Sequence, residues 1–416
     1  VKIKVNAASR SDVRKAFTLY HNNTYVDTFI TEKVILNDNE GYYARQKSKR
    51  VNINAAGDQV PLRLSYNKSK STDQAYLDYI ILNAKRKLTR DKDYMFFRDQ
   101  TRAGTNELVQ YTVENCDEQT EIWEITDPFN IKKITATLSG NKLIFNDSTN
   151  LLREYVVLKP GSTFPKPEIE NNGDDVGPVN NQNLHAIGPH QMLVIPHPLF
   201  RDAADSIAEF HRQKDNLSVA VIDVNHIYNE FSSGTRDVSS IRDFVRMVYD
   251  RATGDYDRLK YVLLAGDGSY NNISKIKGNA NFIPTYQSWN SLYAIRSYVT
   301  DDFFGMLGVD EGGSESMDKY NLEIGLGRLP VKTPEEALIL YNKIKDYNKP
   351  ENKGDWQNNI LFSGDDENGN IHMRQANELA TWMDNNFPQF MVKKVFLDAY
   401  PQASTSIGAR YPDVNR

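Results

Sequence analysis

The sequence contains a single cysteine, Cys116, in 416 residues, so no disulfide can form within the chain. A single cysteine does not indicate whether the protein works in an oxidising or a reducing compartment, because disulfide frameworks need pairs of cysteines. The sequence also lacks a secretory signal and any run of the roughly eighteen apolar residues that span a bilayer. The chain begins with Val1 instead of methionine, and we therefore expect a fragment or a processed form of a longer protein.

Neither sign of charge dominates the composition. The chain has 50 Lys and Arg residues against 55 Asp and Glu residues, a net charge of −5, and no large basic block. Domains that bind nucleic acid carry basic patches, so nucleic acid is not an expected partner. Hydrophobic residues make up 39% and charged residues 25%, which is typical of globular domains. A chain of this length is expected to form two or three such domains.

Residues 1–160 show little helical periodicity and many short apolar runs that alternate with polar residues, as in Leu62–Tyr66. Clusters of Gly, Asn and Asp separate these runs, which is typical of strands joined by turns. We predict an N-terminal domain that resembles a β-sandwich or jelly roll and has the length for two subdomains. Residues 161–190 hold four prolines among many Asn and Asp residues, and this composition predicts a surface linker.

From Met192 onward, buried strands and amphipathic helices alternate. Strands are predicted at 192–196, 217–223 and 261–265, and helices at 202–212 and 238–251. This alternation predicts an α/β subdomain over residues 191–349, built on a doubly wound and mostly parallel sheet. A second α/β unit begins at residue 350. It has only two clear strands, and we therefore expect residues 350–416 to be an incomplete subdomain.

Several motifs follow one another in the second half of the chain: MLVIPHPLF, GDGSY, IPTYQS, DDFFG, GLGRLPVKTPEEA and FLDAYPQ. In this order they resemble the gingipain family of cysteine peptidases over residues 185–416, and within it the sortase-like peptidases of the type IX secretion system. Residues 1–160 resemble the β-rich region that precedes the peptidase. The resemblance implies a caspase- or gingipain-like α/β fold that is truncated at its C-terminal end.

The resemblance also implies a function for the parent protein. Such an enzyme cleaves the C-terminal signal domain from secreted cargo proteins and transfers the cargo to lipopolysaccharide at the outer membrane. The implied location is the cell surface, reached by export with a signal peptide that is not in this chain, and the further partner is an outer-membrane shuttle barrel. Thiol chemistry requires no cofactor. The alternative is a non-catalytic module of the bacterial cell surface that binds cargo or acts as a scaffold.

The family likeness implies a catalytic histidine in a His-Gly context after a buried strand, followed by a cysteine after the next strand. None of the seven histidines has that context, and Cys116 lies between acidic neighbours in the β-rich region. Nearby carboxylates raise the pKa of a thiol and so disfavour the thiolate. We therefore expect no catalytic residue in this chain, which alone should be inactive, and we expect the pair beyond Arg416.

Carboxylates follow strands or flank glycines at several loops, and oxygen-rich loops are what calcium binds. The resemblance to gingipains makes calcium a candidate ligand. Its candidate residues are Asp267, Asp301, Asp302, Asp310, Asp365 and Asp366. No run has EF-hand spacing, and the alternative is that these side chains are solvated or form turns and helix caps.

Three aromatic residues lie near the IPTYQS motif: Tyr286, Trp289 and Tyr293. Aromatic side chains gathered on a loop can line a substrate cleft or support an interface. Packing into the core is the alternative for each of them.

Overall fold

The computed structural model describes residues 1–55, 57, 59–166, 179, 181–272, 281–312, 320–365, 367–405 and 408–410. The chain forms two compact units. The first comprises Val1–Asn181 and Trp289–Ser297, and the second comprises Gln182–Ser288 and Tyr298–Arg416. Residues 289–297 thus pack with the first unit although the chain on both sides of them belongs to the second.

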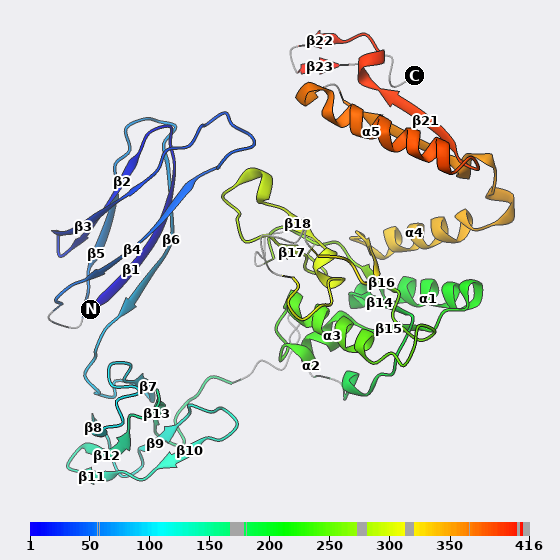
Figure 1. The fold of residues 1–416 in the computed structure, drawn as a ribbon. Helices are drawn as coiled ribbons and strands as arrows, with labels where there is room; N and C mark the ends of the chain where they lie inside the picture. The colour runs from blue at the N-terminus through cyan, green and yellow to red at the C-terminus, as the bar shows by residue number, and fades with distance from the viewer. Residues whose placement is uncertain are drawn as a thin grey trace. The chain divides into compact units, whose positions relative to one another are not determined.

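The first unit begins with two antiparallel sheets that share one core (Figure 1). One sheet has the order β4-β1-β6 and the other the order β3-β2-β5. Alternate residues of β1 and β2, among them Ile3, Val5 and Phe17, point into the core between the sheets. The strands are β1 (Lys2–Arg10), β2 (Lys15–His21), β3 (Thr24–Thr31), β4 (Arg45–Asn52), β5 (Leu62–Tyr66) and β6 (Gln74–Asn83).

A second β module follows in the same unit, with sheet orders β10-β9-β13-β7 and β11-β12-β8. Its core is rich in aromatic rings, with Tyr155 stacked on Phe97 at 5.0 Å between ring centroids. The strands are β7 (Tyr94–Arg98), β8 (Leu108–Glu114), β9 (Glu121–Glu124), β10 (Lys132–Ile134), β11 (Thr137–Ser139), β12 (Lys142–Ser148) and β13 (Glu154–Leu158). The prediction of a β-rich N-terminal region is confirmed.

The second unit is built on a four-stranded parallel sheet of order β15-β14-β16-β19. Its strands are β14 (Met192–Pro196), β15 (Val219–Val221), β16 (Tyr261–Ala265) and β19 (Gly325–Leu329). Helices lie between them in sequence: α1 (Arg201–Asp215), α2 (Val224–Phe231), α3 (Val238–Asp250), and then α4 (Pro334–Tyr347) after β19. The predicted β plus α/β class is confirmed. Helix α2 was not predicted, because it is only eight residues long.

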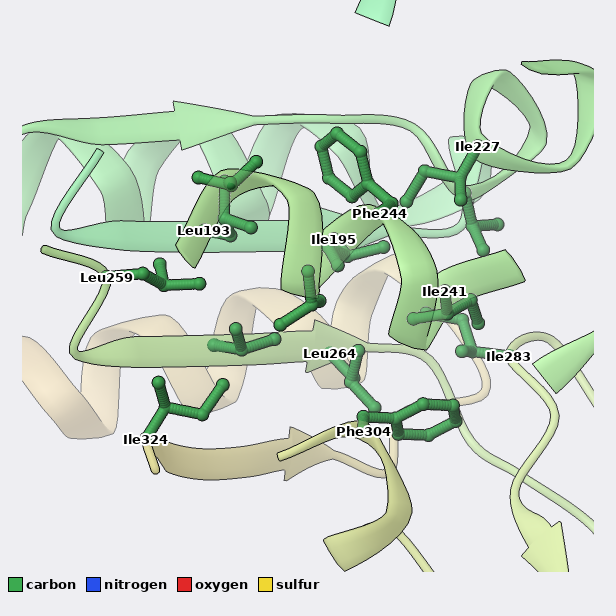
Figure 2. Packing of buried hydrophobic residues seen from close by; sticks show 14 of the residues in the cluster. Leu193, Ile195, Ile227, Ile241, Phe244, Leu259, Leu264, Ile283, Phe304 and Ile324 are labelled. Carbon is green, nitrogen blue, oxygen red and sulfur yellow. The ribbon is translucent and has the colours of Figure 1, made fainter. Parts of the chain in front are cut away.

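Helices cover both faces of this sheet, as the alternation of β14 shows. Leu193 and Ile195 point to the cluster that holds α2 and α3, where Phe244 and Leu264 are fully buried (Figure 2). Val194 points to the other face, against Ala204 and Ala208 of α1. Strands buried on both faces read as continuous apolar runs, which is why the sequence predicts β14 and β16 so closely.

The remaining elements are short. A two-stranded pair joins β17 (Tyr286–Gln287) to β18 (Val299–Thr300). β20 (Asn359–Gly364) and β21 (Met391–Phe396) pair in parallel, and α5 (Glu367–Asn386) lies between them in sequence. β22 (Ala403–Thr405) and β23 (Gly408–Arg410) form a hairpin. Single 3₁₀ turns include η1 (Leu184–Ala186), η2 (Pro198–Phe200), η3 (Ala294–Arg296), η4 (Asp302–Phe304), η6 (Pro350–Asn352), η7 (Asp355–Asn358) and η8 (Leu397–Ala399). Among the described residues no helix is both long and apolar enough to span a bilayer.

Glu230 of α2 holds the start of the second unit in place. Its carboxylate accepts hydrogen bonds from the Leu184 backbone N–H at 2.6 Å and from Gln182 Nε2 at 2.7 Å, and it lies 2.9 Å from His185 Nδ1. The His185 ring also stacks on Phe231, with centroids 4.7 Å apart. Partial burial raises the pKa of Glu230, but the hydrogen bonds outweigh it and lower the pKa to about 2.

This depressed pKa predicts an acid-dependent loss of stability. The unfolded chain binds a proton at Glu230 near its ordinary value of 4.5, whereas the folded chain does so near 2. The stabilisation is therefore complete above about pH 5 and is lost as the pH falls toward 2. The free energy of unfolding, measured with a chemical denaturant at several pH values, should fall less steeply between about pH 5 and pH 2 for Glu230→Gln than for the wild type. Glu351→Gln, at an exposed glutamate, is the control, and identical slopes for all three proteins would contradict the assignment.

Candidate functional site

Polar groups of the second unit gather at the carboxyl ends of β14, β16 and β19. The chain passes from β14 to β15 on one side of the sheet, whereas β16 leads to β19 on the other, so the strand order reverses between β14 and β16. In open parallel sheets, ligands bind in the crevice where this reversal occurs. This edge of the sheet is therefore the candidate functional site.

The loop after β16 makes a sharp turn that brings it against residues 281–285. Gly266 has a φ of +144°, and a Cβ at this position would lie 2.9 Å from Cβ of Phe282. A Cβ on Gly268 would meet Thr285 Cγ2 at 2.5 Å. The carbonyl of Asp267 accepts hydrogen bonds from the N–H groups of Phe282 and Ile283. Glycine is therefore required twice, because the two backbones approach too closely for side chains.

Arg328 of β19 ties these segments together. Its guanidinium donates two hydrogen bonds of 2.7 Å to the carboxylate of Asp301, one from Nε and one from Nη2. Nη1 donates to the carbonyls of Gly266 at 2.8 Å and Ile283 at 2.9 Å, and Nη2 approaches the carbonyl of Pro284 at 3.4 Å. The Arg328 side chain is 10% exposed. A planar guanidinium can bind a carboxylate and several carbonyl oxygens at once, because its N–H donors point in fixed directions within one plane.

Asp267 and His197 lie at the same edge of the sheet, and both contact neighbouring loop residues. Asp267 accepts a hydrogen bond from the Gly268 N–H and forms an ion pair of 3.4 Å with the exposed Lys332. The His197 N–H donates to the carbonyl of Ala265, and its Nδ1 accepts from the Leu199 N–H at the start of η2. Both side chains therefore help to shape the loops at the ends of β14 and β16.

The predicted calcium ligands that the structure describes differ in their partners and exposure. Asp301 gives both of its oxygens to Arg328, and Asp267 faces Lys332. Asp302 begins η4 with an exposed side chain, and Asp310 and Asp365 are also exposed. Asp366 lies outside the described residues. Within the residues that the structure describes, no three His, Cys, Asp or Glu side chains are grouped as metal ligands.

The three aromatic candidates also lie in different surroundings. Tyr286 is half-buried and stacks on Phe303 at 4.7 Å, and burial raises the pKa of its hydroxyl. Trp289 and Tyr293 belong to the segment that packs with the first unit. There Tyr293 stacks on Tyr42 at 4.5 Å, whereas Trp289 is 65% exposed. Tyr286 is thus a core contact of the second unit, whereas Tyr293 packs within the first.

Cys116 lies in the core of the second β module with its side chain buried. Its pKa is raised, and burial is the largest cause; the neighbouring Asp117 adds a smaller effect. The acidic neighbours of Cys116 predict a rise of its pKa, and the rise is present, but burial is its main cause. A buried thiol of raised pKa is a poor nucleophile.

The histidines with a described carboxylate partner serve local structure. His185 lies against Glu230, and His211 Nδ1 is 2.6 Å from the Asp215 carboxylate one helical turn away on α1. The chain's single cysteine, Cys116, is buried in the second β module and does not belong to this edge of the sheet. What the site can do chemically is hold backbone segments in a fixed arrangement at the end of the sheet.

Two arginines that shape this unit were not singled out from the sequence. Arg242 of α3 is buried and donates to the carbonyls of Met306, Gly308 and Glu311. Arg328 is the other. A signal existed for Arg328, because a lone arginine inside an apolar strand must find a partner for its charge. The sequence does not say which carboxylate that partner is.

Comparison with known proteins adds to this geometry. The profile of peptidase family C25 matches residues 185–416. Among solved structures, the chain is similar to dimeric latent PorU from Porphyromonas gingivalis, with a TM-score of 0.68 and 22% sequence identity. The similarity covers 86% of this chain and 34% of the PorU chain, so the chain spans about a third of that protein's length. A comparison with curated proteins finds no significant match.

The contacts of Arg328 predict a large effect on stability. Arg328→Met removes the partner of a largely buried carboxylate and the donors to two carbonyls, which should cost about 3–5 kcal/mol of unfolding free energy. Lys332→Met removes only the exposed ion pair with Asp267 and should cost less than about 1 kcal/mol. Denaturant unfolding of both variants checks this. Equal losses would show that Arg328 does not hold the loops together.

Calcium binding by the acidic loops stays a prediction. A ligand that binds only the folded chain raises its melting temperature. Thermal unfolding with added calcium, then with a chelator in excess, is the measurement. We expect a rise that the chelator reverses if Asp302 or Asp310 contributes a ligand, and Asp302→Asn or Asp310→Asn should then abolish it. An unchanged melting temperature in the presence of calcium would contradict calcium binding by these loops.

Proposed function

The chain belongs to peptidase family C25, and on that premise we propose that it is part of a gingipain-like cysteine peptidase that acts as a sortase of the type IX secretion system. The observation that carries the proposal is the family match over residues 185–416, together with a fold like that of PorU over 86% of the chain. The proposed substrates are secreted cargo proteins with a C-terminal signal domain. The proposed acceptor is lipopolysaccharide at the outer membrane.

The proposed reaction is an acyl transfer. A thiolate attacks the peptide carbonyl before the signal domain, the C–N bond breaks, and the signal domain leaves as a free amine after it takes a proton. The cargo is then held as a thioester. An amine of the acceptor attacks the thioester, the new amide forms, and the thiol is released. No oxidant, metal or cofactor is required by this sequence of steps.

The thiol and its base are proposed to lie in polypeptide that this chain does not contain. Cys116 is its one cysteine, and this thiol is buried in a β module with a raised pKa. On this proposal the chain alone is inactive. Its four-stranded sheet supports the catalytic subdomain, and its β modules provide surfaces for the cargo and for an outer-membrane shuttle barrel.

PorU is dimeric in the crystal structure to which this chain is similar, and we propose that the protein also forms a dimer at the cell surface. The alternative function is a scaffold that binds cargo without cleaving it. The two functions differ in whether the cargo changes covalently.

Analysis of the cargo distinguishes these functions. The whole protein is incubated with a cargo that carries its signal domain and with an amine acceptor, and the products are analysed by mass spectrometry. A sortase should give cargo joined to the amine, and Cys116→Ser should leave this product unchanged. Hydrolysed cargo alone would show a peptidase without transfer. Intact cargo would favour the scaffold, and loss of product in Cys116→Ser would place the nucleophile in this chain.

A further inference from the structure

One end of the second β module presents large apolar side chains to solvent. The loops at this end are 99–107 between β7 and β8, 125–131 between β9 and β10, and 149–153 between β12 and β13. Four side chains on or beside these loops are exposed, and we call them the apolar tip: Phe129 (99%), Leu108 (74%), Ile131 (48%) and Leu151 (45%). Single exposed apolar residues are common, but a group at one end of a small module indicates an interaction site.

The three loops are joined to one another. The strands that lead into them are antiparallel neighbours. The Thr149 N–H donates to the Glu107 carbonyl at 2.9 Å, which joins the third loop to the first. The Glu154 N–H, where the third loop ends, donates to Thr126 Oγ1 of the second loop at 3.0 Å. The loops therefore form one end of the module.

The rest of the chain joins this module at its opposite end. The chain enters at Tyr94 of β7 and leaves at Leu158 of β13, and these two residues are paired across the sheet. Just outside them, the Lys159 N–H donates to the Asp93 carbonyl at 3.2 Å. The apolar tip thus lies at the end of the module that is away from its covalent connections.

Phe129, the most exposed residue of the tip, is held in a tight turn. The Asn130 N–H donates to the Asp127 carbonyl at 3.0 Å, and the Phe129 N–H donates to the Asp127 carboxylate at 2.9 Å. Pro128 follows Asp127, and Asp and Pro are favoured at the first two positions of such a turn. The backbone is therefore ordered in advance, so burial of the Phe129 ring costs little further conformational entropy.

We propose that the apolar tip inserts into the surface of a lipid bilayer with anionic phosphate headgroups. Phe129 and Ile131 enter the boundary between headgroups and acyl chains, the depth at which apolar side chains of surface-bound proteins lie. Lys132 directly follows Ile131 and is exposed. Its methylene groups can lie along the acyl chains while its ammonium reaches a phosphate.

The tip fits a bilayer better than it fits a protein surface. Side chains on separate loops would each need a matching pocket in a protein partner, whereas lipid chains adapt to the shape of what enters them. Charges near the tip are paired with one another, which lowers the cost of bringing them to a membrane. These pairs are Arg98 with Glu154, Arg102 with Asp99, and Arg153 with Asp147.

Insertion of the tip goes beyond the proposed acyl transfer, because it uses neither the thiol nor the cargo. It would hold the protein at the membrane where the proposed acceptor lies. Lipid binding can be measured without cleavage, so its failure is distinct from a failure of the proposed function.

The first experiment is co-sedimentation of the whole protein with vesicles of phosphatidylcholine and phosphatidylglycerol. The wild type should bind, and Phe129→Ser should weaken binding at least about tenfold, because it removes a large buried apolar side chain. Phe96→Ser is the control, since Phe96 is 60% exposed but lies within β7, outside the tip. Absence of binding, equal losses in both variants, or binding only to vesicles that contain outer-membrane proteins would each overturn the proposal.

The second experiment tests the headgroup contact in the same vesicles. Lys132→Ser should weaken binding about fivefold, the contribution of one lysine near an anionic surface. Lys142→Ser removes an exposed lysine at the opposite end of the module and should leave binding unchanged. Equal effects of the two substitutions, or no effect of Lys132→Ser, would contradict the position of Lys132 at the phosphates.

The third experiment measures depth and does not depend on affinity. Bromine atoms on the acyl chains quench the fluorescence of a tryptophan that enters the bilayer. With the signal of the wild type subtracted, vesicles of brominated lipid should quench Phe129→Trp and leave Phe96→Trp unchanged. Quenching of neither variant, or of Phe96→Trp alone, would show that the tip does not insert.

Discussion

The loops at the carboxyl end of the parallel sheet depend on one guanidinium. Arg328 reaches from β19 to both oxygens of Asp301 and to the carbonyls of Gly266 and Ile283, and so joins segments that are far apart in sequence. An ion pair of this kind carries a desolvation cost that offsets much of its Coulomb energy. The main effect of Arg328 is to fix the relative positions of these loop segments, because the donors of a planar guanidinium allow few arrangements of their partners. The close approach of the chain at Gly266 and Gly268 belongs to the same arrangement, because a Cβ at either position would clash with residues 282–285.

The parts of the fold that follow from local patterns were predictable. β16 spans Tyr261–Ala265 as its apolar run indicates, and α3 spans Val238–Asp250, one residue shorter than its periodicity predicts. The cap of α4 is equally local, with the Thr333 hydroxyl accepting a hydrogen bond from the Glu336 N–H. Each of these features depends on residues within a few positions of one another, which is the range over which sequence patterns carry information.

The features that were missed depend on contacts between distant residues. Asp301 follows a strand and has an acidic neighbour, so it looks like a metal ligand until Arg328, 27 residues away, is placed beside it. Tyr286 and Tyr293 are close in sequence, yet one packs on Phe303 and the other on Tyr42. The pKa of Cys116 is raised mainly because a core closes over it, and the sequence shows only its charged neighbours. In each case the outcome was decided by packing.

Residues 289–297 have a consequence for the order in which the protein is made. Tyr293 stacks on Tyr42, and the N–H groups of Tyr43 and Ala294 donate to the carbonyls of Leu292 and Gly41. The ribosome therefore finishes Val1–Asn181 long before the last piece of the same unit has been synthesised, and most of the parallel sheet emerges in between. Until residue 297 has left the exit tunnel, the nascent N-terminal unit keeps an unfilled place beside Tyr42, and a chaperone that recognises exposed aromatic rings would find it there.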